Sequence, residues 1–190
     1  MDTTNKNAGI VGQTQKHIAD VFITILQKTK FQNITVSQII LQSNINRSTF
    51  YAHFLDKFDL VDRVKENLLN ELRKIANQIP DPKKIDDDFT RAHIKRLTNC
   101  LYENGKTFSA LLCDTNVGFT NNLNEFFKTV LIEKNFPAPK IPQNYLTAVQ
   151  ASIITGLFAE WAKTCFREPI EKFTEIIVTA SKGFALGVLN

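Results

Sequence analysis

Apolar residues recur every three or four positions along most of the chain, which is the spacing of amphipathic helices. The first apolar stripe predicts a helix over residues 14–29, behind a polar segment, residues 1–10, that we expect to be disordered. A second helix should begin after Thr35, a good N-cap, and end at Ser43. Because Asn tolerates the left-handed conformation, Asn44 suits the turn that follows.

A short third helix follows this turn. Asn46 can cap it, and the pattern extends it over residues 47–54. Phe50 and Phe54, four residues apart, share one face of this helix. We assign both rings, and that of Phe58, to the core.

A longer fourth helix, capped by Asp56, is expected to carry its apolar stripe from Leu60 to Ile79. The segment PDPKKIDDD, residues 80–88, then breaks the pattern with two prolines and a cluster of charges. Further helices are expected over residues 87–104, directly after Gly105, over 118–135, over 146–161 and over 170–184. No alternating run of β-branched residues suggests a sheet, so the sequence predicts an all-α fold of about nine helices.

Composition and charge are ordinary for a globular protein. The chain of 190 residues is 43% hydrophobic and 22% charged, which suits one large or two small domains. The net charge is only +4, but residues 1–79 hold ten Lys and Arg against seven Asp and Glu. No acidic residue lies between Lys28 and Arg47. A locally basic N-terminal unit is compatible with a polyanionic partner.

Cysteine and histidine offer no chemistry of their own. Cys100, Cys113 and Cys165 form no CxxC pair, and we expect all three to be reduced, buried thiols. The three His residues show no metal-ligand spacing, so no metal or other cofactor is expected. The polar N-terminus has no signal-peptide core and no apolar run reaches membrane-spanning length, so the protein is expected in the cytoplasm, away from membranes.

Residues 34–60 describe a helix-turn-helix: a short helix, a tight turn and a second short helix. A bare pair of helices is common, but the outward side chains here are unusual for a solvated face. With the Phe rings inward, they include hydroxyl, guanidinium, phenol and imidazole groups and no acid, and such groups can donate to phosphates or base edges. Lys57 begins the next helix, where it can meet a phosphate or simply be solvated.

The segment ITVSQIILQSNINRSTFYAHFLDKFDLVDRV resembles the N-terminal DNA-binding domain of TetR-family transcriptional regulators. The resemblance covers about residues 12–62. It rests on Ile34-Thr35-Val36, the turn, Ser48-Thr49-Phe50-Tyr51, His53-Phe54, and Lys57 followed by Leu60. Asn44 stands where the family usually has a glycine, and Ile40 and Leu41 replace its small residues.

The resemblance implies DNA-binding roles for eight residues: Thr35, Ser37, Arg47, Ser48, Thr49, Tyr51, His53 and Lys57. Thr35 and Ser37 would contact phosphates, and the helix that starts at Arg47 would enter the major groove. Arg47 is the first candidate for a base contact, because a bidentate pair with guanine is the commonest specific one. A phosphate contact by Lys57 predicts that Lys57→Ala reduces the salt dependence of binding. The Tyr51 ring could instead be partly core, and His53 a structural hydrogen-bonder.

The resemblance also implies a helix-turn-helix domain over residues 11–58, a linking helix over about 57–79, and an effector-binding and dimerisation domain over 80–190. Candidate dimer residues, on the last two apolar stripes, are Ile153, Leu157, Trp161, Phe173, Ile177 and Phe184. Candidate effector-pocket residues are His93, Tyr102, Phe108, Phe119, Phe127 and Trp161. For both sets the alternative is that the side chains are simply protomer core.

The sequence is therefore interpreted as a homodimeric repressor that a small apolar or aromatic effector releases from two-fold operator DNA. Two alternatives remain: a transcriptional activator or co-regulator that works through a protein partner, and a helical interaction protein that does not bind DNA. An enzyme is not expected, because the chain has no phosphate-binding loop, no HExxH and no nucleophile elbow.

Overall fold

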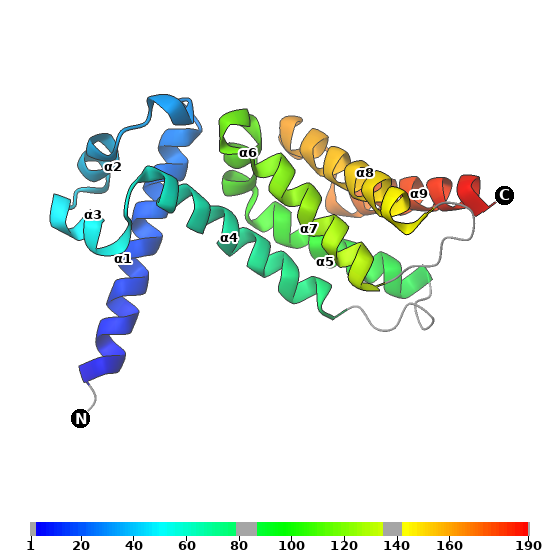
Figure 1. Ribbon diagram of the computed structural model, residues 1–190, viewed down its shortest axis with the longest axis horizontal. Helices are drawn as coiled ribbons and strands as arrows, with labels where there is room; N and C mark the ends of the chain where they lie inside the picture. Colours follow the sequence, from blue (N-terminus) through cyan, green and yellow to red (C-terminus); the bar gives the residue numbers. More distant parts are fainter. Residues whose placement is uncertain (1–2, 79–86, 135–141, 190) are drawn as a thin grey trace. The chain divides into compact units, whose positions relative to one another are not determined.

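The computed structural model describes residues 3–78, 87–134 and 142–189, and side chains within 12–78, 87–133 and 142–181. In these ranges the chain forms helices and no strand, so the predicted all-α class is confirmed. The α-helices are α1 (Thr3–Leu26), α2 (Val36–Ser43), α3 (Arg47–His53), α4 (Lys57–Ala76), α5 (Asp87–Glu103), α6 (Gly105–Cys113), α7 (Phe119–Lys134), α8 (Gln143–Lys163) and α9 (Ile170–Leu189). Two short 3₁₀ helices, η1 (Phe31–Asn33) and η3 (Thr115–Val117), complete them (Figure 1). The chain divides into two compact units, Met1–Asn67 and Leu68–Asn190, and the division falls within α4.

In the first unit, α1 packs against α2 and α3, which also contact each other (Figure 1). Ile18 and Phe22 on α1, Ile39 on α2 and Phe50 on α3 are completely buried. Phe54 is buried as well, so the assignment of these two Phe rings to the core is confirmed. Burial of such large apolar side chains is the main stabilising contribution to this small helical unit.

The predicted caps hold the helix-turn-helix in shape. The Thr35 hydroxyl accepts a hydrogen bond from the Gln38 backbone N–H at 3.2 Å, at the start of α2. Asn44 ends α2 in the left-handed conformation, with φ 52° and ψ 43°. The side-chain oxygen of Asn46 then accepts from the Thr49 N–H at 2.7 Å and starts α3. The turn between the two helices is therefore specified by residues within it.

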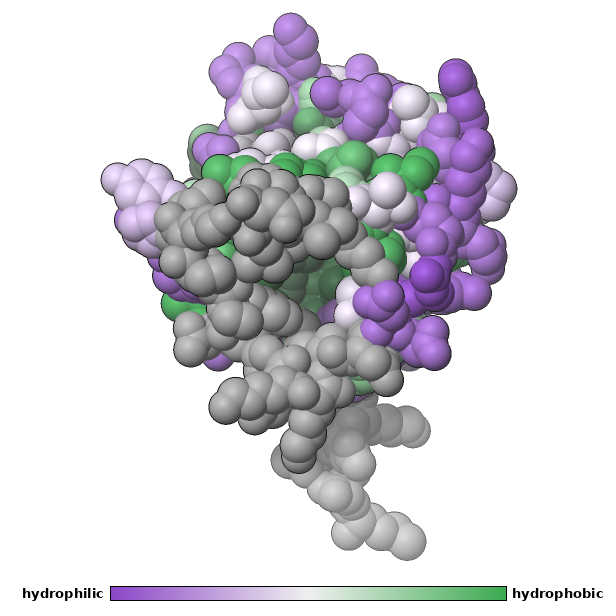
Figure 2. Space-filling view, turned by 90° about the vertical axis from the view of Figure 1, so that its right-hand side faces the viewer, coloured by the Kyte–Doolittle hydropathy of each residue, from purple (hydrophilic) through white to green (hydrophobic). Residues whose placement is uncertain are grey.

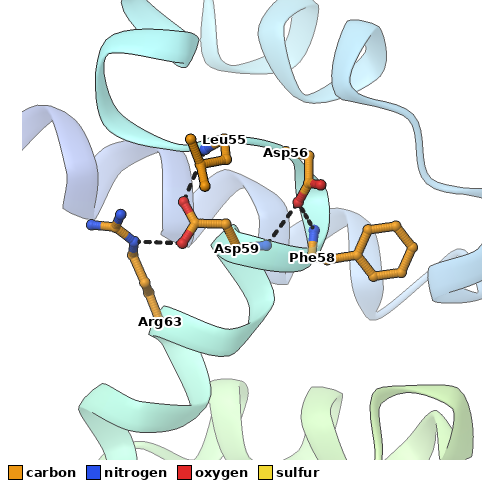
Figure 3. Close-up of polar contacts among 5 residues, drawn as sticks. All are labelled: Leu55, Asp56, Phe58, Asp59 and Arg63. Carbon is orange, nitrogen blue, oxygen red and sulfur yellow. Dashed lines mark hydrogen bonds and ion pairs between the residues drawn. The ribbon is translucent and has the colours of Figure 1, made fainter.

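The start of α4 is held by two carboxylates (Figure 3). Asp56 Oδ1 accepts from the backbone N–H groups of Phe58 and Asp59, each at 2.8 Å, which confirms Asp56 as the cap. Asp59 Oδ1 pairs with Arg63 Nε at 2.9 Å, and Asp59 Oδ2 accepts from the Leu55 N–H at 2.9 Å. The hydrogen bond from Arg63, and then that from Leu55, lower the pKa of Asp59 below its usual value.

Three expectations for the first unit were wrong. α1 begins at Thr3, where disorder was expected, because a helix already nucleated on a buried stripe extends with one hydrogen bond per added residue. It also ends at Leu26, short of the predicted residue 29. Phe58 is 57% exposed, not buried. Its ring meets the Phe31 ring edge-on, with centroids 5.4 Å apart, and covers that ring from outside.

In the second unit, α5 packs against α9, and α7 against α8; α6 and α9 also contact α8. An aromatic core joins these helices. The rings of Phe127 and Phe158 stack with centroids 5.9 Å apart, and Trp161 and Phe173 stack at 4.1 Å. Trp161 Nε1 donates to the Glu168 carbonyl at 2.9 Å, so the buried indole is satisfied. Over the described residues, no helix has the length and apolarity to cross a membrane.

The cysteines differ in environment. Cys100 is buried, and burial, followed by the charges of Glu71 and Glu103, raises the pKa of its thiol to about 11. Cys113 and Cys165 are exposed, so the prediction that all three thiols are buried was wrong. Both exposed residues lie where a helix stops: Cys113 is the last residue of α6, and Cys165 lies in the turn after α8.

Candidate nucleic-acid interface and ligand cavity

The candidate DNA-binding residues lie at the start of α2 and along α3. Thr35, Ser37, Arg47 and Ser48 are exposed, Tyr51 is 45% exposed, and Thr49, His53 and Lys57 are half-buried. Neither α2 nor α3 contains an acidic residue. The helix-turn-helix therefore presents hydroxyl, phenol and guanidinium groups to solvent without a carboxylate on either helix to repel a phosphate.

Asn46 forms hydrogen bonds with the polar side chains at the start of α3. Its side-chain oxygen accepts from the Ser48 hydroxyl at 2.7 Å and the Thr49 hydroxyl at 2.8 Å, besides the Thr49 N–H. An amide oxygen has two lone pairs, so three donors compete for it. One hydroxyl can therefore turn to an external acceptor while the backbone cap stays in place.

Arg47 and Tyr51 lie one turn apart on α3 and touch. The Arg47 guanidinium carbon is 5.5 Å from the centre of the Tyr51 ring, within the range of a cation–π contact. The Tyr51 ring also meets Phe50 edge-on at 5.4 Å, but nearly half of Tyr51 remains exposed. Tyr51 thus rests on the core with one side and supports Arg47 with the other.

A residue that the sequence analysis did not single out joins α1 to the turn. His17 Nε2 lies 3.0 Å from the Ser43 carbonyl, and since a carbonyl only accepts, this nitrogen carries the proton. Ser43 is buried and its hydroxyl donates back to the Ile39 carbonyl at 2.6 Å. The end of α2 is thereby tied to α1 across 26 residues of sequence.

Lys57 does not have the geometry expected of a phosphate contact. Its ammonium group donates to the carbonyls of Phe31 at 3.0 Å, Gln32 at 3.1 Å and Ile34 at 2.8 Å. It also lies 4.9 Å from the centre of the Phe31 ring and 5.5 Å from that of Phe58. An ammonium has three donors, and all three are used within the domain. Lys57 fixes the η1 turn that precedes α2, and a phosphate could reach it only by displacing these carbonyls.

The second unit contains a cavity of about 230 Å³ among α4, α5, α7, α8 and α9. Figure 2 shows a hollow on one face of the molecule with hydrophobic residues inside it. The cavity is lined by Ala76, Phe89, Thr90, His93, Ile94, Leu97, Phe126, Phe127, Val130, Leu131, Gln150, Ile153, Ile154, Phe158, Ile177 and Ser181. None of these lining residues is Asp, Glu, Lys or Arg.

The candidate pocket residues separate into two groups. His93 and Phe127 line the cavity, and His93 stacks on Phe89 with ring centroids 5.9 Å apart. The other four do not line it: Phe108, Phe119 and Trp161 belong to the buried core, and Tyr102 is 49% exposed. The lining residues that sequence reasoning missed are largely aliphatic, for example Ile94, Leu97 and Ile177. Their helical spacing is the same as that of core residues, so periodicity cannot identify them.

Three of the candidate dimer residues are buried within the protomer. Trp161, Phe173 and Ile177 are at most 3% exposed and belong to the core of the second unit. Ile153 and Leu157 are half-buried, and Ile153 lines the cavity. The side chain of Phe184 lies outside the described residues.

Comparisons with known proteins show which proteins this chain resembles. No protein-family model matches the chain. A stretch of 59 residues is 37% identical to the HTH-type dhaKLM operon transcriptional activator DhaS of Lactococcus lactis, and covers 31% of this chain and 32% of that relative. The chain thus matches about a third of the length of this curated relative.

Solved structures match over nearly the whole chain. A putative TetR-family transcriptional regulator from Syntrophomonas wolfei superposes with a TM-score of 0.70 at 16% identity, over 93% of this chain and 97% of that chain. A TetR transcriptional regulator from Streptococcus agalactiae gives 0.68 at 20%, over 95% and 99%. The dihydroxyacetone kinase operon activator DhaS gives 0.61 at 21%, over 90% and 94%. The chain therefore has the fold of TetR-family transcriptional regulators.

Proposed function

We propose that the protein is a sequence-specific DNA-binding transcriptional regulator of the TetR type. The observation that carries this proposal is the acid-free pair of helices α2 and α3, capped through Thr35 and Asn46, with Arg47 and Ser48 exposed on the second helix. In this assignment α3 enters the major groove and the start of α2 meets the phosphate backbone. Lys57 acts inside the domain, as the support of the turn.

Selection of bound sites from random double-stranded DNA with the purified protein tests the proposal. A two-fold symmetric motif is the expected result, because one helix-turn-helix reads only a half-site. A variant with Arg47→Ala and Tyr51→Ala, checked for an unchanged helical spectrum, serves as the control and should lose enrichment. Failure of the folded wild-type protein to enrich any sequence would favour a helical interaction protein instead.

The protein is expected to act as a homodimer through α8 and α9. Apolar side chains exposed on these helices support this: Tyr145 is 64% exposed, Val149 43% and Ile176 36%. Tyr145 and Val149 are four residues apart and share one face of α8. Light scattering at micromolar concentration should give twice the chain mass, and Val149→Glu should lower it. A monomeric wild-type protein would contradict the homodimer.

The direction of regulation has two candidates. Our first is repression, relieved when a small molecule in the cavity favours an arrangement unsuited to the operator. The second is activation, favoured by one observation: the relative DhaS is named as an activator. Transcription in vitro from a promoter that carries the selected motif separates them, since a repressor lowers and an activator raises transcript yield.

A further inference from the structure

The cavity of the second unit, the space of about 230 Å³ lined by α4, α5, α7, α8 and α9, has features that restrict its ligand. Among its described lining residues only His93 is ionisable. Burying an unpaired charge against apolar walls is strongly unfavourable. An ionic ligand would meet no Asp, Glu, Lys or Arg side chain on the described walls, so these walls suit an uncharged ligand.

The volume sets the size of the ligand. An apolar cavity of about 150 Å³ accepts benzene. A cavity of 230 Å³ therefore has room for one six-membered ring with a short substituent. Phe127 and Phe158, stacked at 5.9 Å, and Phe126 supply aromatic walls against which a ring can pack.

One polar group of the wall needs a partner. Gln150 on α8 lines the cavity, and its Oε1 is buried without a hydrogen-bond partner among the described residues. A buried carbonyl oxygen without a donor is unfavourable. The terminal torsion of a Gln side chain is soft, so the amide can turn toward the cavity at small cost. A ligand hydroxyl suits this amide, because it can donate to the oxygen and accept from the nitrogen.

We infer that this cavity binds an uncharged, single-ring molecule that carries one hydroxyl group, held by the amide of Gln150 within walls from Phe126 to Phe158. One part of the inference rests on the proposed function: that this ligand is the effector of a transcriptional regulator. Binding itself is a property of the cavity and is measured without DNA.

Calorimetric titration of the full-length protein with three matched probes tests the inference. The first is 4-ethylphenol, neutral at pH 7 since a phenol has a pKa of about 10. The second is 4-ethyltoluene, which replaces the hydroxyl by a methyl group, and the third is 4-methylbenzoate, which is charged. On the wild type, 4-ethylphenol should bind about fivefold to tenfold tighter than 4-ethyltoluene, and the benzoate should not bind.

Gln150→Leu should remove the preference for the phenol and leave 4-ethyltoluene bound at least as tightly as before. Gln150→Met, which keeps the unbranched shape, repeats the test if the Leu variant does not show a native helical spectrum. Ile154→Trp, which fills the cavity, should weaken both neutral probes. These variants separate the role of the Gln150 amide from general apolar binding.

Equal binding of the two neutral probes to the wild type, binding of the benzoate as tight as the phenol, or no binding of any probe would each overturn the inference. The DNA selection is read independently. A protein that enriches a two-fold motif but binds no probe loses only this ligand assignment. If the protein prefers the phenol but enriches no DNA sequence, the ligand assignment stands and the proposed function is wrong.

Discussion

The ammonium nitrogen of Lys57 lies 2.8 Å from the backbone oxygen of Ile34, the residue directly before the cap of α2. Two further carbonyls, those of Phe31 and Gln32, complete its three hydrogen bonds. The first residue of α4 thus holds the turn that positions Thr35 at the start of α2. Lys57 therefore stabilises the helix-turn-helix through contacts within the domain.

Lys57→Met keeps the length of the side chain and removes its donors, so it should lower the free energy of unfolding by about 2 kcal/mol. The slope of log affinity for DNA against log salt should stay unchanged, whereas loss of a phosphate contact reduces that slope by about 1. Urea unfolding and DNA titrations at several salt concentrations measure both. Lys28→Met, a change of an exposed lysine, is the matched control. If Lys57→Met has the stability of the wild type but a reduced salt slope of DNA affinity, Lys57 contacts a phosphate after all.

Arg47→Ala should weaken binding to the selected operator by about 1–3 kcal/mol while leaving the free energy of unfolding nearly unchanged, because Arg47 is exposed. Arg47→Lys keeps the charge but cannot form a bidentate pair with guanine. If Arg47 reads a base, the Lys variant should lose specificity at one position of each half-site. Competition titrations with single-base variants of the operator measure this. If Arg47→Lys binds the operator with full affinity and specificity, Arg47 contacts a phosphate and not a base.

The helix-turn-helix could be predicted from the sequence because its signals are local. Thr35, Asn46 and Asp56 each satisfy a backbone N–H within three residues, and Asn44 adopts the left-handed turn in place. The supports that sequence reasoning missed are long-range. His17 reaches a carbonyl 26 residues away, and Lys57 reaches three carbonyls 23 to 26 residues away. Helical periodicity carries no information about such partners.

The second unit shows a different limit. An apolar stripe predicts that a helix is buried on one side, but not what covers it. Trp161 and Phe173 stack on each other inside the protomer, whereas Ile153, eight residues before Trp161 on the same helix, lines the cavity. Core, cavity and partner surfaces use the same residue types at the same spacing, and only the arrangement of helices separates them.

Asp59 should make stability depend on pH in the acidic range. Its pKa is lowered in the folded protein, chiefly by the hydrogen bond from Arg63, relative to a usual value of about 3.9. The stabilisation is therefore fully present above about pH 4 and is lost as pH falls through the lower, folded pKa. Asp59→Asn should be less stable than the wild type at pH 7, and the difference should shrink below pH 4. Urea unfolding at pH 7 and at about pH 3 measures this; a constant difference would show that charge is not involved.

Two of the three thiols should react in the native protein. Cys113 and Cys165 are exposed, while the Cys100 thiol is buried with its pKa raised to about 11. At pH 8 that thiol stays protonated, and the thiolate is the reactive form. A thiol-reactive chromophore should release two equivalents rapidly and a third only in denaturant. Cys113→Ser/Cys165→Ser should leave no rapid phase, and a remaining fast equivalent would mean that Cys100 is accessible.

Gly105→Ala should destabilise the second unit, because an added Cβ would lie 2.9 Å from Cε2 of Phe166. Phe166 has little freedom to withdraw. Its backbone is left-handed, with φ 56°, its N–H donates to the Trp161 carbonyl at 2.9 Å, and its ring meets the Trp161 ring edge-on at 4.9 Å. Overpacking of this kind costs about 1–3 kcal/mol.

Urea unfolding of a double-mutant cycle checks the cause of that loss. In the presence of Phe166→Leu, which removes the atoms that the new Cβ meets, Gly105→Ala should cost less than it does alone. Gly156→Ala is the matched control, since nothing lies within 4 Å of a Cβ at that position. Within a helix this change should stabilise by about 0.5–1 kcal/mol. If Gly105→Ala stabilises equally, Phe166 yields to the methyl group and the contact is not restrictive.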